Sequence, residues 1–349
     1  MNRKLSRVCL VLGLSGMLTA GLATTANAAT PTWQTLLTLS NAGVTSPDGA
    51  PVTFDTVLAT GPATGWGFPS GGTAAYQRTG STWTKVPFPA HSGRVLAAGY
   101  SSPSDVWAID DNSGNEEFMH WNGSAWALWR SQQTGAIVNA ISVLGPRDVW
   151  AFSSPVANGA GIWRYDGIRW TEISNTLHGG SALADNDVWA FSGSSVDHYD
   201  GSTWTATSVA SLLPDWSSAQ VTGILALAPD NVYAVGDGGS QTHGGAVVLL
   251  HYDGTSWSQV AASGNRGGED LTSDGAGGVW LLTVANNENL LHYSGGTLSV
   301  VNIASTPASE PDYASSLSLI PGGTGLLVGA EQYVTPDLSQ TNSVVLQYS

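Results

Sequence analysis

The chain has 349 residues and a formal net charge of −15, with 26 Asp and Glu against 11 Lys and Arg. Such an acidic protein repels phosphate backbones and anionic lipids, which argues against nucleic-acid and membrane binding. Only 11% of the residues are charged and 43 are Gly, a composition typical of an extracellular all-β protein.

The chain begins with a basic segment at residues 3–7, followed by an apolar stretch from Val8 to Leu22 and by the small-residue pattern of Ala26–Ala28. This order is typical of a secretory signal peptide. We therefore predict a signal peptide at residues 1–28 and a single folded domain at residues 29–349 of a secreted, extracellular protein.

Cysteine is nearly absent, since Cys9 is the only one and lies before the predicted cleavage point. The mature chain then has no disulfide and must be stabilised by packing alone, for which it is long enough. An exported protein without cysteine is typical of bacterial secretion, and we expect a monomer.

Three features recur along the rest of the chain. The first is an aromatic or apolar residue in a short run such as "DVWA", at Trp66, Trp107, Trp150, Trp189, Tyr233, Trp280 and Leu327, with gaps of 41, 43, 39, 44, 47 and 47 residues. The second is an aromatic residue that ends another run, at Tyr76, Trp121, Tyr165, Tyr199, Tyr252, Tyr293 and Tyr348. The third follows a turn, at Trp83, Trp126, Trp170, Trp204, Trp257 and Leu298.

Turn dipeptides such as Asn122-Gly123 and Asp200-Gly201 separate the second feature from the third. Asn-Gly and Asp-Gly between β-rich runs favour two-residue type I′ hairpins. Another turn precedes the first feature, and one more apolar run precedes that turn. Each unit is therefore predicted to contain four short antiparallel strands, named A to D in chain order.

A repeat of roughly 40–45 residues with four strands is typical of a β-propeller blade. The seven units predict an all-β fold: a seven-bladed β-propeller of four-stranded antiparallel blades. The last unit ends with Ser343–Ser349, which is its strand C. We expect Pro31–Leu39 to supply the missing outer strand and close the ring, because closure removes an exposed sheet edge.

The repeats "DVWA" and "HYDGSTW" resemble those of secreted bacterial β-propeller proteins over residues 30–349. The Asp-Gly-x-x-Trp turns are also similar to the Asp-boxes of sialidase-like propellers, although they are one residue shorter. In those families the Asp-box is a structural turn away from the active site. The resemblance therefore implies the architecture and not the chemistry. Galactose-oxidase-like chemistry is excluded, because its Tyr–Cys cross-link needs a cysteine.

The 15 Trp residues fall into two groups. Those at the recurring positions are predicted to be wedges between blades, since a large aromatic side chain at a fixed place in each blade packs against its neighbour. Trp129 and Trp216 fit none of these positions and are expected in D-to-A connections, on the ligand-binding rim. They are our first candidates for ligand contact.

Four histidines precede the aromatic residue that ends strand C: His120, His198, His251 and His292. Because they belong to different blades, we expect each to hold a turn of its own blade and not to form a metal site. A weak candidate for Ca²⁺ is the acidic segment with Asp110, Asp111 and Asn112, since oxygen-rich loops that contain Gly can bind this ion. No other cofactor is indicated.

Arginine is rare, and Arg94, Arg130 and Arg266 are expected at D-to-A connections on the same rim as Trp129 and Trp216. If they face a shared central funnel, they could clamp a carboxylate together. They complete the set of predicted ligand-binding residues.

The sequence leaves two functions open. The first is an extracellular binding or interaction module for a glycan or a protein, because no nucleophile, metal or phosphate-binding motif is present. The second is a glycan-active hydrolase or lyase with acid/base residues in the central funnel. Its candidate carboxyl groups are Asp110, Glu116, Asp215, Glu269 and Asp270.

Overall fold

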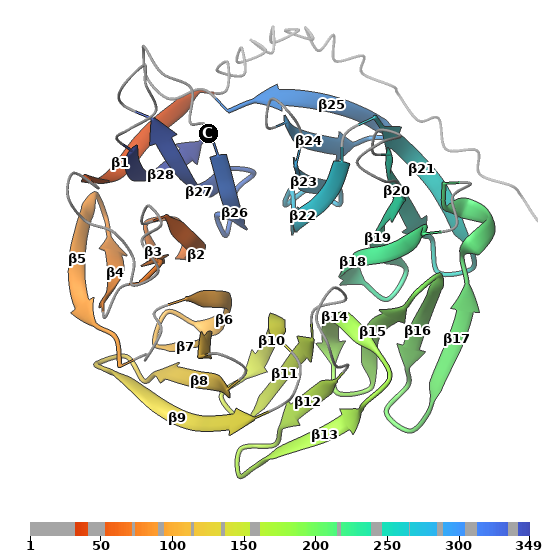
Figure 1. Ribbon diagram of the computed structural model, residues 1–349, viewed down its shortest axis with the longest axis horizontal. Helices are drawn as coiled ribbons and strands as arrows, with labels where there is room; N and C mark the ends of the chain where they lie inside the picture. The colour runs from red at the N-terminus through yellow and green to blue at the C-terminus, as the bar shows by residue number, and fades with distance from the viewer. Residues whose placement is uncertain are drawn as a thin grey trace, which may run out of the picture. The chain divides into compact units, whose positions relative to one another are not determined.

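The structure is a computed structural model that describes residues 32–40, 53–71, 74–89, 94–112, 115–133, 137–153, 161–214, 218–238, 246–264, 266–284, 289–303, 313–333 and 341–349. The predicted signal peptide lies outside these residues. Thr32–Ser349 form one compact unit. This unit consists of seven four-stranded antiparallel sheets arranged as the blades of a ring, which confirms the predicted seven-bladed β-propeller (Figure 1).

The first four blades follow one another along the chain. Blade 1 contains β2 (Phe54–Gly61), β3 (Thr64–Pro69), β4 (Ala74–Thr79) and β5 (Thr82–Pro87). Blade 2 contains β6 (Val95–Ser102), β7 (Asp105–Asn112), β8 (Asn115–Trp121) and β9 (Trp126–Gln133). Blade 3 contains β10 (Val138–Gly145), β11 (Asp148–Ser153), β12 (Ile162–Tyr165) and β13 (Trp170–Ser174). Blade 4 contains β14 (His178–Ala184), β15 (Asp187–Ser192), β16 (Ser195–Tyr199) and β17 (Trp204–Ser208).

A 3-10 turn, η1 (Ala210–Leu212), precedes the last three blades. Blade 5 contains β18 (Gln220–Ala228), β19 (Asn231–Gly238), β20 (Ala246–Tyr252) and β21 (Trp257–Ser263). Blade 6 contains β22 (Arg266–Ser273), β23 (Val279–Val284), β24 (Asn289–Ser294) and β25 (Thr297–Asn302). Blade 7 contains β26 (Tyr313–Leu319), β27 (Leu326–Tyr333), β28 (Thr341–Tyr348) and, from the start of the chain, β1 (Trp33–Ser40). No helix in these described parts is long and apolar enough to cross a membrane.

The ring is closed by β1, which pairs antiparallel with β28 in register Trp33 to Tyr348. The backbone N–H of Thr32 donates to Ser349 at 2.8 Å, and the N–H of Ser349 donates to Thr32 at 3.1 Å. The predicted closure is confirmed, with the strand at Trp33–Ser40 where the sequence predicted Pro31–Leu39.

The strand-B aromatic residues are wedges between blades, as predicted. Trp66 of blade 1 lies 4.8 Å from Trp121 and 5.1 Å from Trp126 of blade 2, measured between ring centroids. Trp189 of blade 4 contacts Tyr252 and Trp257 of blade 5 at 5.1 and 5.9 Å. Such edge-to-face contacts add to the free energy gained by burying each ring.

The strand-C histidines hold the A-to-B turns, as expected. Nε2 of His120 lies 2.7 Å from Oδ1 of Asp105, and the imidazole stacks on Trp107 at 4.5 Å. The same arrangement recurs for His198 with Asp187 and Trp189, for His251 with Asn231 and Tyr233, and for His292 with Asp274 and Trp280. In blade 3 Arg164 replaces the histidine: it donates to Asp148 at 2.9 Å and lies 5.4 Å from the centre of the Trp150 ring.

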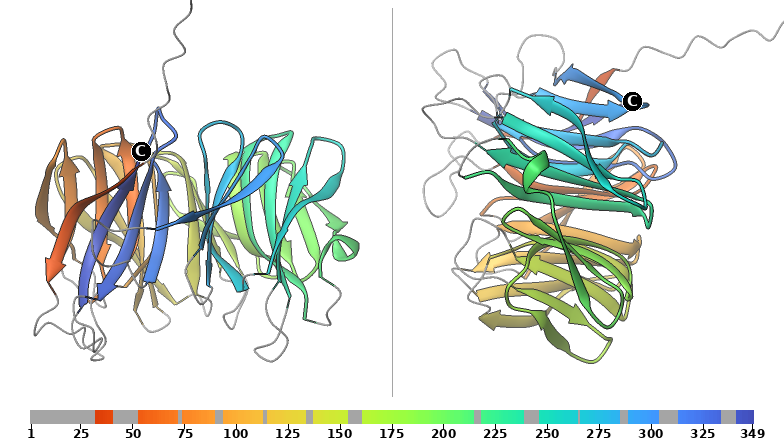
Figure 2. Two further views of the ribbon diagram at one scale, coloured as in Figure 1. Left: turned by 90° about the horizontal axis from the view of Figure 1, so that it is seen from above. Right: turned by 90° about the vertical axis from the view of Figure 1, so that its right-hand side faces the viewer.

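The C-to-D turns of blades 1 and 6 are two-residue loops, as predicted, since Thr79 pairs with Thr82 and Ser294 with Thr297. Those of blades 2 to 5 differ from the prediction. Tyr199 pairs with Trp204, so the loop between them has four residues and is not a two-residue type I′ hairpin. The reason is the Asp200 carboxylate, whose Oδ1 accepts the N–H groups of Ser202 and Thr203, both at 2.8 Å. Asn122, Asp166 and Asp253 do the same in their blades. The A-to-B and C-to-D turns together form one face of the ring, here called the turn face (Figure 2).

Removing residues 29–40 should destabilise the whole ring, because β28 then loses its partner and exposes the edge of blade 7. We expect one cooperative transition lowered by about 10 °C or more compared with the chain that starts at residue 29. Differential scanning calorimetry of the two proteins measures this difference. Melting temperatures that agree within a degree or two would contradict a structural role for β1.

Candidate functional site

The main concave feature is a central channel of about 900 Å³. It is lined mostly by the inner strands β2, β6, β10, β14, β18, β22 and β26, so every blade contributes to its wall (Figure 1). Propellers place ligand sites at such axial openings because loops and inner strands from several blades converge there.

β-bulges determine which inner-strand side chains face the channel. Each inner strand skips a residue in its pairing with strand B, and the skipped residues Asp55, Leu96, Asn139, Thr222 and Ser315 all line the channel. A bulge turns a side chain out of the regular alternation of a strand. The sequence analysis missed these residues, because no sequence signal marks a bulge whose position depends on strand pairing.

Hydroxyl groups in the channel wall tie neighbouring blades together. The Oγ of Ser142 accepts the backbone N–H of Ala182 at 3.0 Å, and that of Ser318 accepts the N–H of Ala59 at 3.0 Å. Equivalent bonds join Ala226 to Ser181, Leu319 to Thr272 and Val57 to Ser316. These residues satisfy backbone donors at the edges of the inner strands and have a structural role.

Asp270 belongs to this structural group and not to a catalytic pair. Its Oδ2 accepts the backbone N–H of Leu317 at 2.6 Å, across the boundary between blades 6 and 7. Of the other candidate carboxyl groups, Asp215 lies outside the described residues, as does the side chain of Glu269. Asp110 and Glu116 are buried within blade 2 and do not line the channel.

The predicted arginine clamp does not form. Arg94 lines the channel, is 63% exposed and lies 3.9 Å from Asp111. Arg130 lies on the outer strand β9, three strand spacings from β6, or about 14 Å. The side chain of Arg266 lies outside the described residues. Since Arg94 shares the lining with Asp55, Asp237 and Asp270, the described channel carries more negative than positive charge.

The structure describes only one of the two candidate tryptophans. Trp216 lies outside the described residues. Trp129 lies within the outer strand β9, not in a D-to-A connection as predicted, and does not line the channel. It is the bulged residue of β9, three positions after the strand-D Trp126, and Ile173 and Val260 are the bulged residues of β13 and β21. Trp129 therefore occupies a repeat position that the sequence analysis did not identify.

The candidate calcium residues do not converge. Asp110 and Asp111 are consecutive on β7, and consecutive side chains of a strand point to opposite faces. The side chain of Asn112 lies outside the described residues. Among the residues that the structure describes, no group of three or more His, Cys, Asp or Glu is placed to hold a metal ion.

Glu116 is the most perturbed acid of this segment. It is fully buried opposite Asp111 on the paired strand, and neither of its carboxyl oxygens meets a donor in hydrogen-bond geometry. The pKa of Glu116 is raised to about 8, chiefly by burial and also by the charges of Asp111 and Asp110. A hydrogen bond with the Val138 amide lowers this pKa, but by less than the other effects raise it. Glu116 is therefore protonated at neutral pH.

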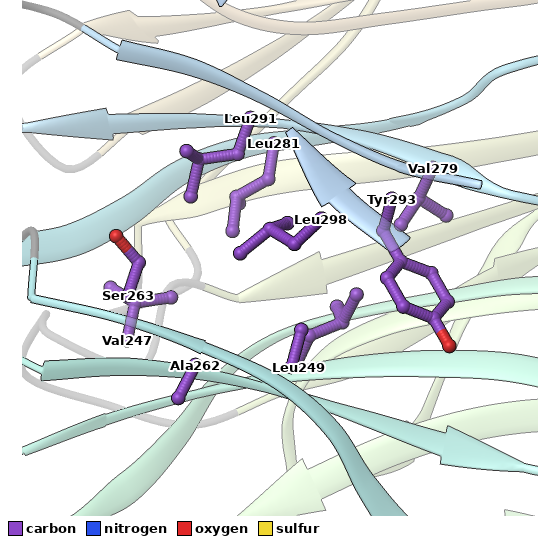
Figure 3. A pocket seen from close by; sticks show the side chains of 10 residues that line it. Val247, Leu249, Ala262, Ser263, Val279, Leu281, Leu291, Tyr293 and Leu298 are labelled. Atoms are coloured by element: carbon purple, nitrogen blue, oxygen red, sulfur yellow. The ribbon is translucent and has the colours of Figure 1, made fainter. Parts of the chain in front are cut away.

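A second hollow is an apolar crevice between blades 5 and 6 (Figure 3). Its volume is about 10 Å³, close to the smallest space that admits one water molecule. Leu298 lines it, at the position where the strand D of every other blade carries a Trp. The smaller side chain explains the crevice, which we interpret as incomplete packing and not as a ligand site.

No protein-family model and no curated protein matches the sequence. Solved structures match in fold alone. YCF48 bound to D1 peptide is 14% identical and superposes with a TM-score of 0.55, covering 90% of this chain and 94% of that one. The WD40 β-propeller domain of Doa1 is 9% identical, with a TM-score of 0.58 and coverages of 90% and 96%. The extracellular domain of a candidate one-component system from B. thetaiotaomicron is 15% identical, with a TM-score of 0.56 and coverages of 84% and 38%.

Replacing Glu116 with Gln should change how stability depends on pH. The folded-state pKa of Glu116 is raised from 4.5 to about 8, so its contribution to stability is fully present below pH 4.5 and is lost as the pH rises through about 8. Glu116→Gln should therefore be more stable than the wild type by about 2–5 kcal/mol at pH 8, whereas at pH 4 the variant should not be more stable than the wild type. Urea unfolding at both pH values measures this, with the exposed Glu172→Gln as control. A difference from the wild type that is equal at both pH values would refute the assignment.

Replacing Leu298 with Trp should fill the crevice between blades 5 and 6. We expect a gain in stability of about 1 kcal/mol, because the other blades already accommodate Trp at this position. Thermal unfolding should show a higher melting temperature for Leu298→Trp and a lower one for Leu298→Ala, which enlarges the crevice. If Leu298→Trp were destabilised as much as Leu298→Ala, the crevice would have no room for the larger side chain.

Proposed function

We propose that this protein is an extracellular binding module that recognises a neutral glycan at the central channel. The observation that carries the proposal is the wall of the channel, where Asn139 and Thr222 present an amide and a hydroxyl group from two blades. Short polar side chains that converge from several directions can form hydrogen bonds to the hydroxyl groups of a sugar.

The charge of the channel favours a neutral ligand. Three carboxylates, Asp55, Asp237 and Asp270, accompany one guanidinium, Arg94, among the lining residues. An acidic sugar would meet more repulsion than attraction there. This differs from the carboxylate clamp that three arginines would form, because only Arg94 of the three is described at the channel.

The hydrolase alternative has less support. A glycosidase of the common type needs one carboxyl group that stays protonated at working pH, close to a second, ionised one. Glu116 and Asp197 have a raised pKa, in both cases chiefly through burial, and neither lines the channel. The propellers of similar fold include YCF48 bound to D1 peptide and an extracellular domain, which agrees with a binding role outside the cell.

The test is a glycan array probed with residues 29–349, followed by calorimetric titration of the bound glycan. We expect neutral glycans to bind and glycans that carry uronic or sialic acid to be excluded. Asn139→Ala combined with Thr222→Val should weaken binding about tenfold or more, a loss of about 1.4 kcal/mol, without lowering the melting temperature.

The matched control is Gln259→Ala, which removes an exposed amide from the outer strand β21 and should leave the affinity unchanged. Product analysis after prolonged incubation separates binding from hydrolysis. An array without any bound neutral glycan, or binding that survives the double substitution, would contradict the proposal.

A further inference from the structure

A second surface lies at the outer edge of the ring, where blade 2 meets blade 3 (Figure 1). We call it the Trp129 patch and define it as Trp129, Arg147, Ile168 and Arg169. Ile168 is 83% exposed and Trp129 is 50% exposed, and both arginines are exposed. The patch thus combines two large apolar side chains with two cations.

Trp129 and Arg147 both interact with Tyr165, which is itself buried. The Trp129 ring lies 5.8 Å from the Tyr165 ring, in an edge-to-face arrangement across the boundary between the blades. Burial raises the pKa of Tyr165, and the charge of Arg147 and a hydrogen bond with Trp129 partly offset this effect. Tyr165 is the residue before the Asp166 turn.

Arg147 also lies against that turn. Gly167 has φ = +90°, and a Cβ atom added to it would lie 2.7 Å from Cβ and 3.0 Å from Nε of Arg147. The arginine side chain therefore packs directly against this glycine. Ile168 and Arg169 are the next two residues, and their N–H groups both donate to Oδ1 of Asp166 at 2.9 Å. The turn therefore holds Ile168 and Arg169 beside Arg147 on the turn face.

The patch departs from the repeat at every position. The equivalents of Ile168 are Ser124, Ser202 and Thr255, and those of Arg169 are Ala125, Thr203 and Ser256. The equivalents of Arg147 are Ser104, Asn186 and Asp230, and those of Trp129 include Val86, Ile173 and Val260. Since the other blades fold with smaller residues at these places, the fold does not require the larger ones.

The charge of this region is opposite to that of the whole chain. Residues 130–169 contain four Arg and two Asp, whereas the chain has a net charge of −15. Arg164 is bonded to Asp148 and Asp185. Arg147 and Arg169 form no ion pair within 4.0 Å of any carboxylate that the structure describes. Together with the backbone hydrogen bonds of the turn, the charge of Arg169 helps to lower the pKa of the neighbouring Asp166, and the two arginines with this one carboxylate leave the turn with a net positive charge.

We propose that the Trp129 patch docks an acidic protein segment that carries an apolar side chain. Trp and Arg are the residues most often found at the energetic centre of protein interfaces, and an exposed Ile beside them provides apolar contact area that a sugar ring would not need. The local excess of arginine selects a negatively charged partner by complementarity. This surface is separate from the channel, and the proposal does not depend on glycan binding there.

The test begins with random peptides displayed on phage and selected on immobilised residues 29–349. Enriched peptides should contain Asp or Glu together with Leu, Ile, Phe or Trp. A synthetic copy of the most enriched peptide is then titrated by fluorescence anisotropy, and its affinity should fall as NaCl is raised. Enrichment of neutral or basic peptides would overturn the proposal.

The repeat itself supplies variants that should still fold. Ile168→Ser with Arg169→Thr copies the turn of blade 4, where Ser202 and Thr203 hydroxyls donate to Asp200. Trp129→Val copies blades 1 and 5, and Arg147→Asn copies blade 4. Each change should weaken peptide binding about tenfold or more. The melting temperature should be unchanged in the turn variant and in Arg147→Asn, and lowered in Trp129→Val, which loses ring contacts with Trp107, His120 and Tyr165.

Two controls separate this proposal from the others. Val300→Ser removes a 56% exposed apolar side chain from blade 6 and should leave peptide affinity unchanged. Asn139→Ala with Thr222→Val, which tests the channel, should also leave it unchanged. If the peptide binds the blade 4 turn variant as tightly as the wild type, or loses affinity through the channel substitutions, the patch is not the docking site.

Discussion

The packing of one large side chain from strand B of each blade against the next blade is the contact on which the ring depends. Trp66, Trp107, Trp150 and Trp189 are almost completely buried at successive boundaries, and Tyr233, Trp280 and Leu327 continue the series. Because every sheet is apolar on both faces at these boundaries, no blade can bury its surface without two neighbours. In blades 2 to 6 a histidine or arginine packs against the wedge residue and links it to the turn of its own blade.

The innermost strands have a different role from the strand-B wedge residues. Their free edges face the axis, where hydroxyl groups of Ser142, Ser181, Thr272 and Ser318 accept N–H groups of the next blade. These bonds tie each inner strand to the next blade. The same strands therefore carry residues that bond to a neighbouring blade, such as Asp270, and side chains that line the opening, such as Asn139, which we propose as a ligand contact.

Periodicity was sufficient to predict the fold. The spacing of the strand-B residues predicts seven blades, and the lack of a fourth strand after strand C at Ser343–Ser349 predicts where the ring closes. The candidate site was harder to predict than the fold, because the side chains that face the channel depend on strand-pairing registers, which a single sequence does not specify. A bulge placed Trp129 in the outer wall, and the Asx geometry of Asp200 replaced a two-residue hairpin. Arg94 and Arg130 are both predicted at D-to-A connections, yet Arg94 immediately precedes the innermost strand β6, whereas Arg130 lies within the outermost strand β9. The remaining candidates, Trp216 and the side chain of Arg266, lie outside the described residues.

The pairing of β1 with β28 also affects the order in which the blades can be completed during synthesis. The strand that comes first in the propeller completes its last blade, so seven complete sheets can form only after β28 has been synthesised. This contact spans almost the whole sequence, which makes it the one with the largest loop-closure entropy and the latest to form. Blades 1 to 6 are each continuous in the chain and can assemble one after another during synthesis. Until then Trp33–Ser40 remains an unpaired strand, available to any exposed sheet edge it meets, including that of another copy.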